Sequence, residues 1–264
     1  PEQFVQQRLG RILSVGLHGS ATPTTLTTAE LGRTVTFTFK PDAGYRVKNV
    51  TVDGKSIGSV TSYTVPKLSI YTRISVEFTN GKLPFADVQE NDWFYDDVVY
   101  VYEAGLFSGT SDTLFSPYAP MTRAMLVTVL YRLEGQPVVY GRSGFADVTM
   151  GSYYENAVTW AANNGIVDGT SATTFNPNAN VTREQMAAIL YRYAQHKRYS
   201  TAASSALSGF ADAAAVADYA KTAMQWAVGA GLLNGAAGRL LPKGNAKRAE
   251  VAAILHRFAM SFAK

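Results

Sequence analysis

Three arginines occupy equivalent positions in this chain and could bind anions. Arg123, Arg183 and Arg248 each stand at the start of an apolar stretch with helical spacing. A cation in the first turn of a helix faces the positive end of the helix dipole, at a cost of about a few tenths of a kcal/mol. Its presence in all three places indicates a nearby anion. This anion is either an internal carboxylate or the carboxylate of a ligand, which a guanidinium can bind through two parallel hydrogen bonds. Both can hold together, and the internal candidates are Asp87, Asp147 and Asp212.

Three aromatic residues recur with the arginines. Trp93, Tyr153 and Tyr219 follow the aspartates by six residues in the first two copies and by seven in the third. An aromatic face can stack on the apolar face of a sugar ring, but an aromatic residue beside a helix start can equally be a core anchor. The aspartates likewise either cap a local turn or contribute to a binding groove.

Three glycines complete the set of candidate site residues: Gly109, Gly169 and Gly235. Each begins a loop that ends in a proline turn. Because glycine lacks a Cβ atom, it permits an unusual turn conformation or the close approach of another chain segment or a ligand.

These residues recur because one unit is used three times. The string FADV at Phe85–Val88 returns at Phe145–Val148 and, as FADA, at Phe210–Ala213. Equivalent positions of the first two copies differ by 60 residues, and those of the second and third differ by 65 or 66. Such constant offsets identify an internal repeat. We place the three repeats at residues 83–135, 143–195 and 208–264.

Each repeat is expected to contain two helices separated by a loop. Apolar residues at helical spacing predict first helices at residues 96–104, 156–164 and 221–230, and second helices that begin at the three arginines. Thr182 and Gln185 have the spacing of a capping box. One such unit cannot bury both apolar stripes alone, so the three repeats should pack together.

Residues 1–80 are expected to form a separate, small antiparallel β domain. Val35, Phe37 and Phe39 alternate with polar residues, as in a strand with one buried face. Asp53 and Gly54 between two short apolar runs predict a tight hairpin turn. The whole chain is therefore predicted to be an α+β protein.

Composition excludes several classes of function. The absence of cysteine and the three scattered histidines give no metal-ligand spacing, and we expect no cofactor. The net charge of +4 comes from residues 1–80, which hold nine Lys/Arg and five Asp/Glu, so the repeats lack the basic face that nucleic acids require. No apolar run is long enough for a membrane span. The acidic residues shared by the copies are the turn aspartates alone, and no nucleophile motif appears, so we expect no enzyme activity. Because Pro1 is not a natural start, any secretion signal is expected to lie outside this sequence.

The repeats resemble S-layer homology domains. The resemblance lies in the FADV strings, in the segment DWFYDDVVYVYEAGLFSG and in partial threonine–arginine–alanine–glutamate signatures around Arg123, Arg183 and Arg248. It implies a pseudo-threefold, mainly α prism that binds the pyruvylated secondary cell-wall polysaccharide of Gram-positive bacteria in grooves between repeats. It also implies a secreted, non-catalytic module at the cell surface or S-layer. The alternative is a protein–protein scaffold or a self-assembling surface-layer component that contacts other surface-layer proteins.

Two further expectations concern the first 80 residues and the differences between the three repeats. The string TVTFTFKPDAGYRVKNVTVDGKSIG in the first 80 residues resembles the internalin B-repeat type of surface module, which implies a spacer. The three repeats also depart differently from the signature, with Met125 in the first repeat and Lys247 in the third. We expect a groove that uses Arg123 or Arg183 to bind best, because Lys247 lacks the capping hydroxyl.

Overall fold

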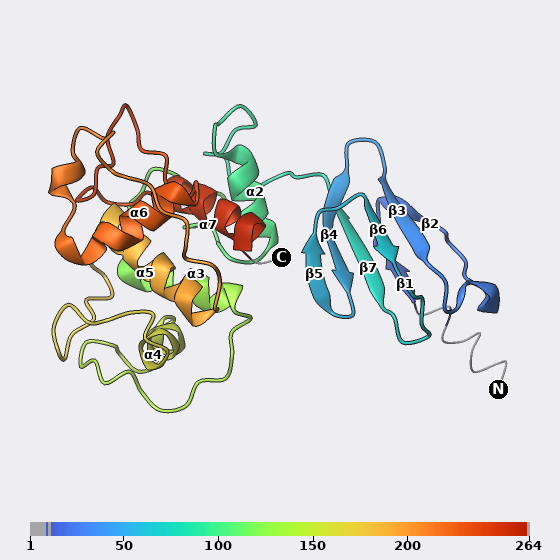
Figure 1. The fold of residues 1–264 in the computed structure, drawn as a ribbon, viewed down its shortest axis with the longest axis horizontal. Helices are drawn as coiled ribbons and strands as arrows, with labels where there is room; N and C mark the ends of the chain where they lie inside the picture. Colours follow the sequence, from blue (N-terminus) through green and yellow to red (C-terminus); the bar gives the residue numbers. More distant parts are fainter. Residues whose placement is uncertain (1–8, 10–11, 263–264) are drawn as a thin grey trace. The chain divides into compact units, whose positions relative to one another are not determined.

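The chain has an α+β fold divided into two compact units (Figure 1). The computed structural model describes Leu9 and residues 12–262. The boundary between the units lies between Leu83 and Pro84, and the first unit contains the strands while the second contains the α-helices named below. Among the described residues, no helix combines the length and apolar character needed to cross a membrane.

The first unit consists of two β-sheets and a short helix. One sheet has the strand order β1-β7-β4-β5 and the other the order β2-β3-β6. The strands are β1 (Leu13–Val15), β2 (Gly19–Thr22), β3 (Val35–Pro41), β4 (Arg46–Val52), β5 (Lys55–Gly58), β6 (Ser62–Val65) and β7 (Ile74–Thr79), with the 3-10 helix η1 at Thr28–Glu30.

The alternating apolar residues of the first unit form its core, as the sequence predicts. Val35, Phe37 and Phe39 of β3 are buried in one cluster with residues of the other sheet. Asp53 and Gly54 turn the chain between β4 and β5, both with positive φ angles of 51° and 82°. The expectation of a wholly antiparallel domain is wrong at one point, because β1 pairs with β7 in parallel. A parallel pair needs a long connection, which the strands between β1 and β7 provide.

The second unit contains two α-helices from each repeat. The first helices are α2 (Tyr95–Glu103), α4 (Glu155–Asn163) and α6 (Lys221–Gly229), and the second are α3 (Arg123–Leu133), α5 (Arg183–His196) and α7 (Arg248–Phe262). The third repeat adds the 3-10 helices η2 (Ala213–Ala215) and η3 (Asp218–Ala220). The second helices begin at the arginines, as predicted. Gly105, Gly165 and Gly231 end the first helices with positive φ, where glycine avoids the steric penalty of a Cβ atom.

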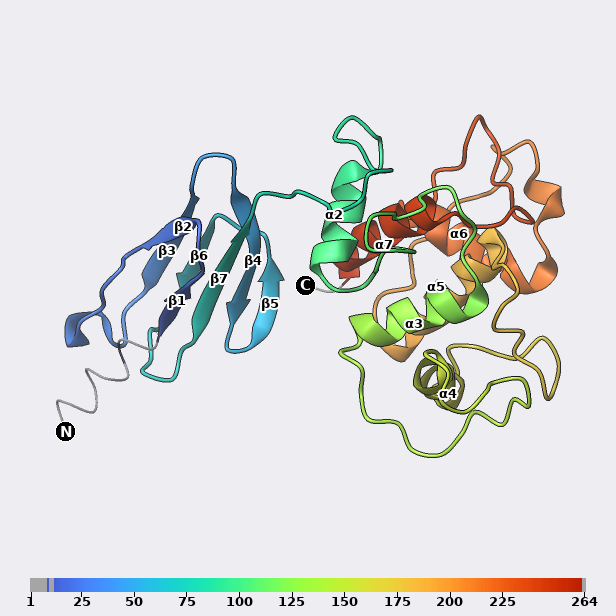
Figure 2. The same cartoon turned by 180° about the vertical axis from the view of Figure 1, so that it is seen from behind.

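Helices pack in pairs between repeats. The second helix of each repeat packs against the first helix of the next: α3 against α4, and α5 against α6. The third pair joins α7 of the last repeat to α2 of the first, and both views show these two helices side by side (Figures 1 and 2). Each of these apolar helices is therefore packed against a helix of a neighbouring repeat, as expected if one unit cannot bury its stripes alone.

The loops before the second helices meet in a closed set of backbone hydrogen bonds. The N–H of Met121 donates to the carbonyl of Ala246, that of Ala246 to Val181, and that of Val181 to Met121, each at 2.9 Å. All three residues are fully buried. The three repeats thus contact one another at a common point.

Candidate functional site

The repeated aspartates fix the loop that precedes each second helix. Both carboxylate oxygens of Asp87 accept from the backbone, from the N–H of Phe115 at 2.8 Å and that of Ser116 at 2.7 Å. Asp147 binds the amides of Phe175 and Asn176 in the same way. The aspartates therefore cap a distant turn, 28 and 29 residues away, rather than a local one.

Asp212 makes the third such contact, with the amides of Leu240 and Leu241 at 2.8 Å each. Desolvation raises the pKa of Asp212, but hydrogen bonds from these two amides and the charge of Arg239 together lower it by more, so the pKa lies below its ordinary value. The carboxylate oxygens of all three aspartates are engaged with their own repeat.

The three arginines bind the same loops from the neighbouring repeat. Arg248 donates from Nε to the carbonyl of Phe115 at 2.7 Å, Arg123 to that of Phe175 at 2.8 Å, and Arg183 to that of Leu240 at 2.8 Å. One aspartate and one arginine therefore hold each of these loop residues, the aspartate at its N–H and the arginine at its C=O. The three arginine residues are only 6 to 9% exposed.

The remaining guanidinium contacts differ between the arginines. Arg123 and Arg248 each donate an Nη2 hydrogen to a loop carbonyl, of Asp168 and Ser108 respectively. Arg183 instead forms an ion pair with Glu250, at 2.8 Å between Nη1 and Oε2. Of these three arginines, Arg183 alone forms an ion pair with an internal carboxylate of the described residues, and that carboxylate is Glu250 rather than an aspartate. The predicted partners Asp147 and Asp87 act on Arg123 and Arg248 through their charge, without an ion pair.

Each of Arg123 and Arg248 keeps one guanidinium nitrogen for another partner. Their Nη1 atoms have no hydrogen bond within the described part of the chain and are not among its buried unsatisfied atoms. These side chains are therefore mostly enclosed, yet each has an atom that reaches solvent.

The predicted aromatic residues are exposed. Trp93, Tyr153 and Tyr219 have exposed fractions of 61%, 63% and 58%. Their neighbours in sequence, Phe94 and Tyr154, are buried instead and serve as core anchors. The alternative interpretation of Trp93, Tyr153 and Tyr219 as core residues is wrong, and their faces are available for contact.

The predicted glycines seat the phenylalanine of each repeat signature. A Cβ atom on Gly109 would lie 2.6 Å from the ring of Phe85, and one on Gly169 would lie 2.7 Å from that of Phe145. The same contact would arise between Gly235 and Phe210. Because these distances are too short for carbon atoms, the sites require glycine for packing within the loop.

A second arginine in each repeat lies near the first set of arginines and was not among the candidate residues chosen from the sequence. Arg132 and Arg257 donate to the carbonyls of Leu106 and Leu232, at 2.9 and 3.0 Å. Arg192 forms an ion pair of 2.8 Å with Asp168. These arginines follow the first set by nine residues in all three copies, and this constant spacing is the signal that identifies them.

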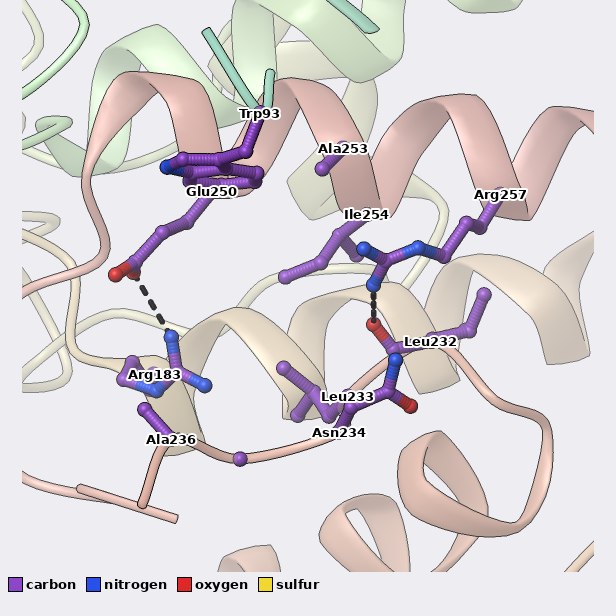
Figure 3. Close-up of a pocket in the computed structure, with 11 residues that line it drawn as sticks. Trp93, Arg183, Leu232, Leu233, Asn234, Ala236, Glu250, Ala253, Ile254 and Arg257 are labelled. Atoms are coloured by element: carbon purple, nitrogen blue, oxygen red, sulfur yellow. Dashed lines mark hydrogen bonds and ion pairs between the residues drawn. The ribbon is translucent and has the colours of Figure 1, made fainter. Parts of the chain in front are cut away.

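One pocket gathers residues from all three repeats. It has a volume of about 200 Å³ and is lined by Trp93 of the first repeat, Arg183 of the second, and Asn234, Glu250 and Arg257 of the third. Figure 3 shows Trp93 above Glu250, with the guanidinium of Arg183 facing the carboxylate and that of Arg257 near Leu232. We call this the Trp93 pocket. Its aromatic side chain, two cations and one carboxylate can bind a polar ligand that has an apolar face.

Equivalent residues form two further clusters. The Tyr153 cluster contains Tyr153, Arg132, Arg248 and Ser108. Burial raises the pKa of Tyr153, while a hydrogen bond with Thr122 and the charge of Arg132 oppose this shift. Arg132 and Arg248 bind backbone carbonyls of the same short segment, at Leu106 and Ser108.

The Tyr219 cluster contains Tyr219, Arg123, Arg192 and Asp168. Burial and the carboxylate of Glu184 raise the pKa of Tyr219 to about 12, against the opposing charges of Arg123 and Arg192. The Tyr219 hydroxyl donates to Glu184 at 3.1 Å. No group of three acidic or histidine side chains among the described residues could hold a metal ion.

Comparison with known proteins gives three matches to one family along this chain. Residues 84–124, 144–187 and 209–252 match the S-layer homology domain. Among curated proteins, the chain is 32% identical over 177 residues to an amylopullulanase of Thermoanaerobacterium thermosulfurigenes, covering 65% of this chain and 9% of that protein. It is 30% identical over 197 residues to an endoglucanase of Bacillus sp. (strain KSM-635), covering 74% and 20%.

A third relative carries a surface-layer name. The chain is 32% identical over 131 residues to the surface-layer 125 kDa protein of Lysinibacillus sphaericus, covering 47% of this chain and 11% of that protein. The chain thus spans a fifth or less of the length of these three relatives. Each of the three sequence copies, together with the loop and helix start that it contributes to the site, matches the S-layer homology domain.

Proposed function

We propose that the second unit is a non-catalytic module that attaches a larger protein to the envelope of a Gram-positive bacterium. The module would bind the pyruvylated secondary cell-wall polysaccharide between its repeats, which we propose to form a three-sided, pseudo-threefold prism. The observation that carries the proposal is the placement of an exposed aromatic side chain beside arginines of the helices, two in the Trp93 pocket and beside Tyr219, and Arg132 beside Tyr153.

The relatives support attachment over catalysis. An amylopullulanase, an endoglucanase and a surface-layer protein are similar to this chain over a minor part of their lengths. A segment shared by proteins with such different names is best explained by a task common to all of them. We propose a location at the cell surface, in contact with the cell wall, for the same reason.

The site residues have distinct roles in this proposal. Trp93, Tyr153 and Tyr219 stack on sugar rings, and Arg123, Arg183 and Arg248 bind the acidic ketal, Arg123 and Arg248 through their free Nη1 atoms. The repeated aspartates and glycines shape the loops against which the sugar lies. The first unit serves as a spacer, a role that its resemblance to B-repeat modules supports.

A binding assay with purified sacculi tests the proposal. We expect the protein to sediment with intact sacculi and to stay in solution with sacculi stripped of polysaccharide. Sedimentation with stripped sacculi would instead support the alternative, a scaffold that binds another surface protein.

Variants connect that assay to the site. Replacing Trp93, Tyr153 and Tyr219 together by alanine should abolish sedimentation, because stacking is lost at every site. Single replacements should have mild effects on sacculi, since three weak sites on one body act by avidity. Tyr140→Ala is the matched control, because Tyr140 is 82% exposed and belongs to none of the three clusters. Unchanged sedimentation of the triple variant would contradict the proposal.

A further inference from the structure

We infer that the three clusters are unequal and that the Tyr153 cluster is the principal anion site of this chain, with Arg132 as a binding residue. This inference rests on the proposed function, because it assumes a ligand that carries a carboxylate. It follows from the different partners that the arginines have in the three places.

In the Trp93 pocket an internal carboxylate already occupies the arginine. Arg183 and Glu250 form an ion pair of 2.8 Å, and their side chains are 10% and 29% exposed. Partial burial reduces solvent screening and strengthens such a pair. An incoming carboxylate would therefore compete with Glu250 for Arg183, which leaves Arg257 as the cation without an ion pair in this pocket.

In the Tyr219 cluster carboxylates lie beside the cations. Arg192 is paired with Asp168 at 2.8 Å, and Glu184 accepts from the Tyr219 hydroxyl. Glu184 is itself bound by Lys243 and by a backbone amide. The carboxylate of Asp168 lowers the attraction of this cluster for a second anion.

In the Tyr153 cluster both of these carboxylate positions are neutral. Met125 stands where the third repeat has Glu250, and Ser108 stands where the second has Asp168. Arg132 and Arg248 donate to backbone carbonyls, and neither forms an ion pair with any carboxylate in the part of the chain that the structure describes. Arg132 therefore lies beside the exposed Tyr153, and Arg248 binds the same short segment as Arg132, so this cluster holds two cations without a neutralising side chain.

Burial of Arg248 strengthens the attraction between its guanidinium and an anion that binds here. Desolvation lowers the pKa of Arg248, opposed by the charge of Asp87. Asp147 acts on Arg123 in the same sense, so this contribution does not distinguish the two clusters. A guanidinium that has lost water and has no ion-pair partner gains more from an incoming carboxylate than one already paired.

This order differs from the one expected from the sequence. The sequence favoured the grooves that use Arg123 or Arg183, because Lys247 lacks a capping hydroxyl. The structure shows that ion pairs with Glu250 and Asp168 reduce the free positive charge at the other two places. Charge balance, rather than helix capping, is the property that bears on anion binding.

The test uses a monovalent probe and the whole chain. Calorimetry would measure binding of a methyl N-acetylhexosaminide that carries a pyruvate ketal, with the same glycoside lacking the ketal as the neutral probe. Arg132→Gln should weaken binding of the ketal by about ten- to a hundredfold, the range expected for losing a hydrogen bond to a charged group. The matched variants Arg192→Gln and Arg257→Gln remove the equivalent arginines of the two weaker sites and should each weaken binding of the ketal less than Arg132→Gln does.

A second variant separates charge from folding. Met125→Glu places in the Tyr153 cluster the carboxylate that the Trp93 pocket already has, and it removes none of the observed hydrogen bonds. It should weaken the ketal probe to a similar degree while leaving the thermal unfolding temperature near that of the unmodified protein. A strong loss with Arg192→Gln or Arg257→Gln, together with unchanged binding by Arg132→Gln and Met125→Glu, would overturn this inference alone. No preference of the unmodified protein for the ketal probe would overturn the proposed function as well.

Discussion

At the scale of single residues, the aspartates and arginines of the repeats act on the same loop residue from opposite sides. Ser116, Asn176 and Leu241 follow the residue so fixed and have φ angles of 57°, 58° and 52°. Residues other than glycine disfavour this left-handed region. Two charge-assisted hydrogen bonds, donated by backbone N–H groups of the loop to one carboxylate, offset the strain. The strained backbone of each loop is therefore stabilised by an aspartate 28 or 29 residues earlier in the chain.

This contact predicts a pH dependence for Asp212. Its pKa is lowered in the folded protein, so it contributes stability above the unfolded pKa of about 3.9 and loses that contribution as the pH falls through the folded pKa. Asp212→Asn should lower the unfolding temperature at neutral pH. An asparagine side chain has only one acceptor oxygen, so its NH2 group would face one of the two backbone N–H donors that the carboxylate now binds. The difference from the unmodified protein should shrink in acid.

Circular dichroism melts between neutral and acidic pH check this expectation. Asp112→Asn is the control, since Asp112 is exposed and lies in a loop of the first repeat. A difference between Asp212→Asn and the unmodified protein that stayed constant into strong acid would show that the charge is not the cause.

At the scale of elements, the second helices differ in how their N-termini are capped. Thr122 and Thr182 accept from the amides of Met125 and Gln185 at 3.2 and 3.3 Å. At the start of α7, Lys247 stands in the equivalent position and has no hydroxyl. Its backbone N–H donates to the carboxylate of Glu250 at 3.4 Å. Half of a capping box is therefore present at α7.

Completing that box should stabilise the protein. Lys247→Thr adds the missing acceptor, and we expect a gain of about 0.5 to 1 kcal/mol in the free energy of unfolding. Thr182→Ala should cost about 1 kcal/mol for the opposite reason. Urea denaturation measures both changes. A Lys247→Thr variant less stable than the unmodified protein would show that the stacking of Lys247 on Tyr118, at 5.8 Å from the ring centre, outweighs the cap.

At the scale of the whole second unit, the chain closes on itself. The pairing of α7 with α2 joins the last repeat to the first, so each repeat has two neighbours. At this contact His256 bonds Asp97 at 2.8 Å and stacks on Tyr100 at 4.1 Å between ring centres. An open array of repeats leaves its terminal repeats with one neighbour each, whereas this arrangement buries both ends.

Closure predicts strong cooperativity between repeats. A chain that ends after residue 207 would lose the partners of α2 and α5 and two of the three central backbone hydrogen bonds. We expect the remaining two repeats to lack a cooperative unfolding transition and to bind a hydrophobic dye. Differential scanning calorimetry of the shortened and full chains checks this. A sharp transition of the two repeats at an unchanged temperature would show that closure is not required.

Local pattern was sufficient to predict many features of the structure. The start of each second helix and the hairpin at Asp53 and Gly54 depend on residues a few positions apart. The threefold repeat is a property of the sequence itself and was confirmed by the three domain matches. The candidate site residues could also be chosen from the sequence, since they share one position in each copy.

Only the tertiary structure decided how these residues are used. Trp93 and Phe94 are neighbours of the same type, yet Trp93 is 61% exposed and Phe94 is fully buried. Arg183 meets Glu250 across 67 residues, so no local pattern indicates that pair. The sequence alone determined which elements form, because capping, periodicity and turn preferences act over a few residues. Packing decided partners and exposure, because these depend on which distant surfaces the closed set of repeats brings into contact.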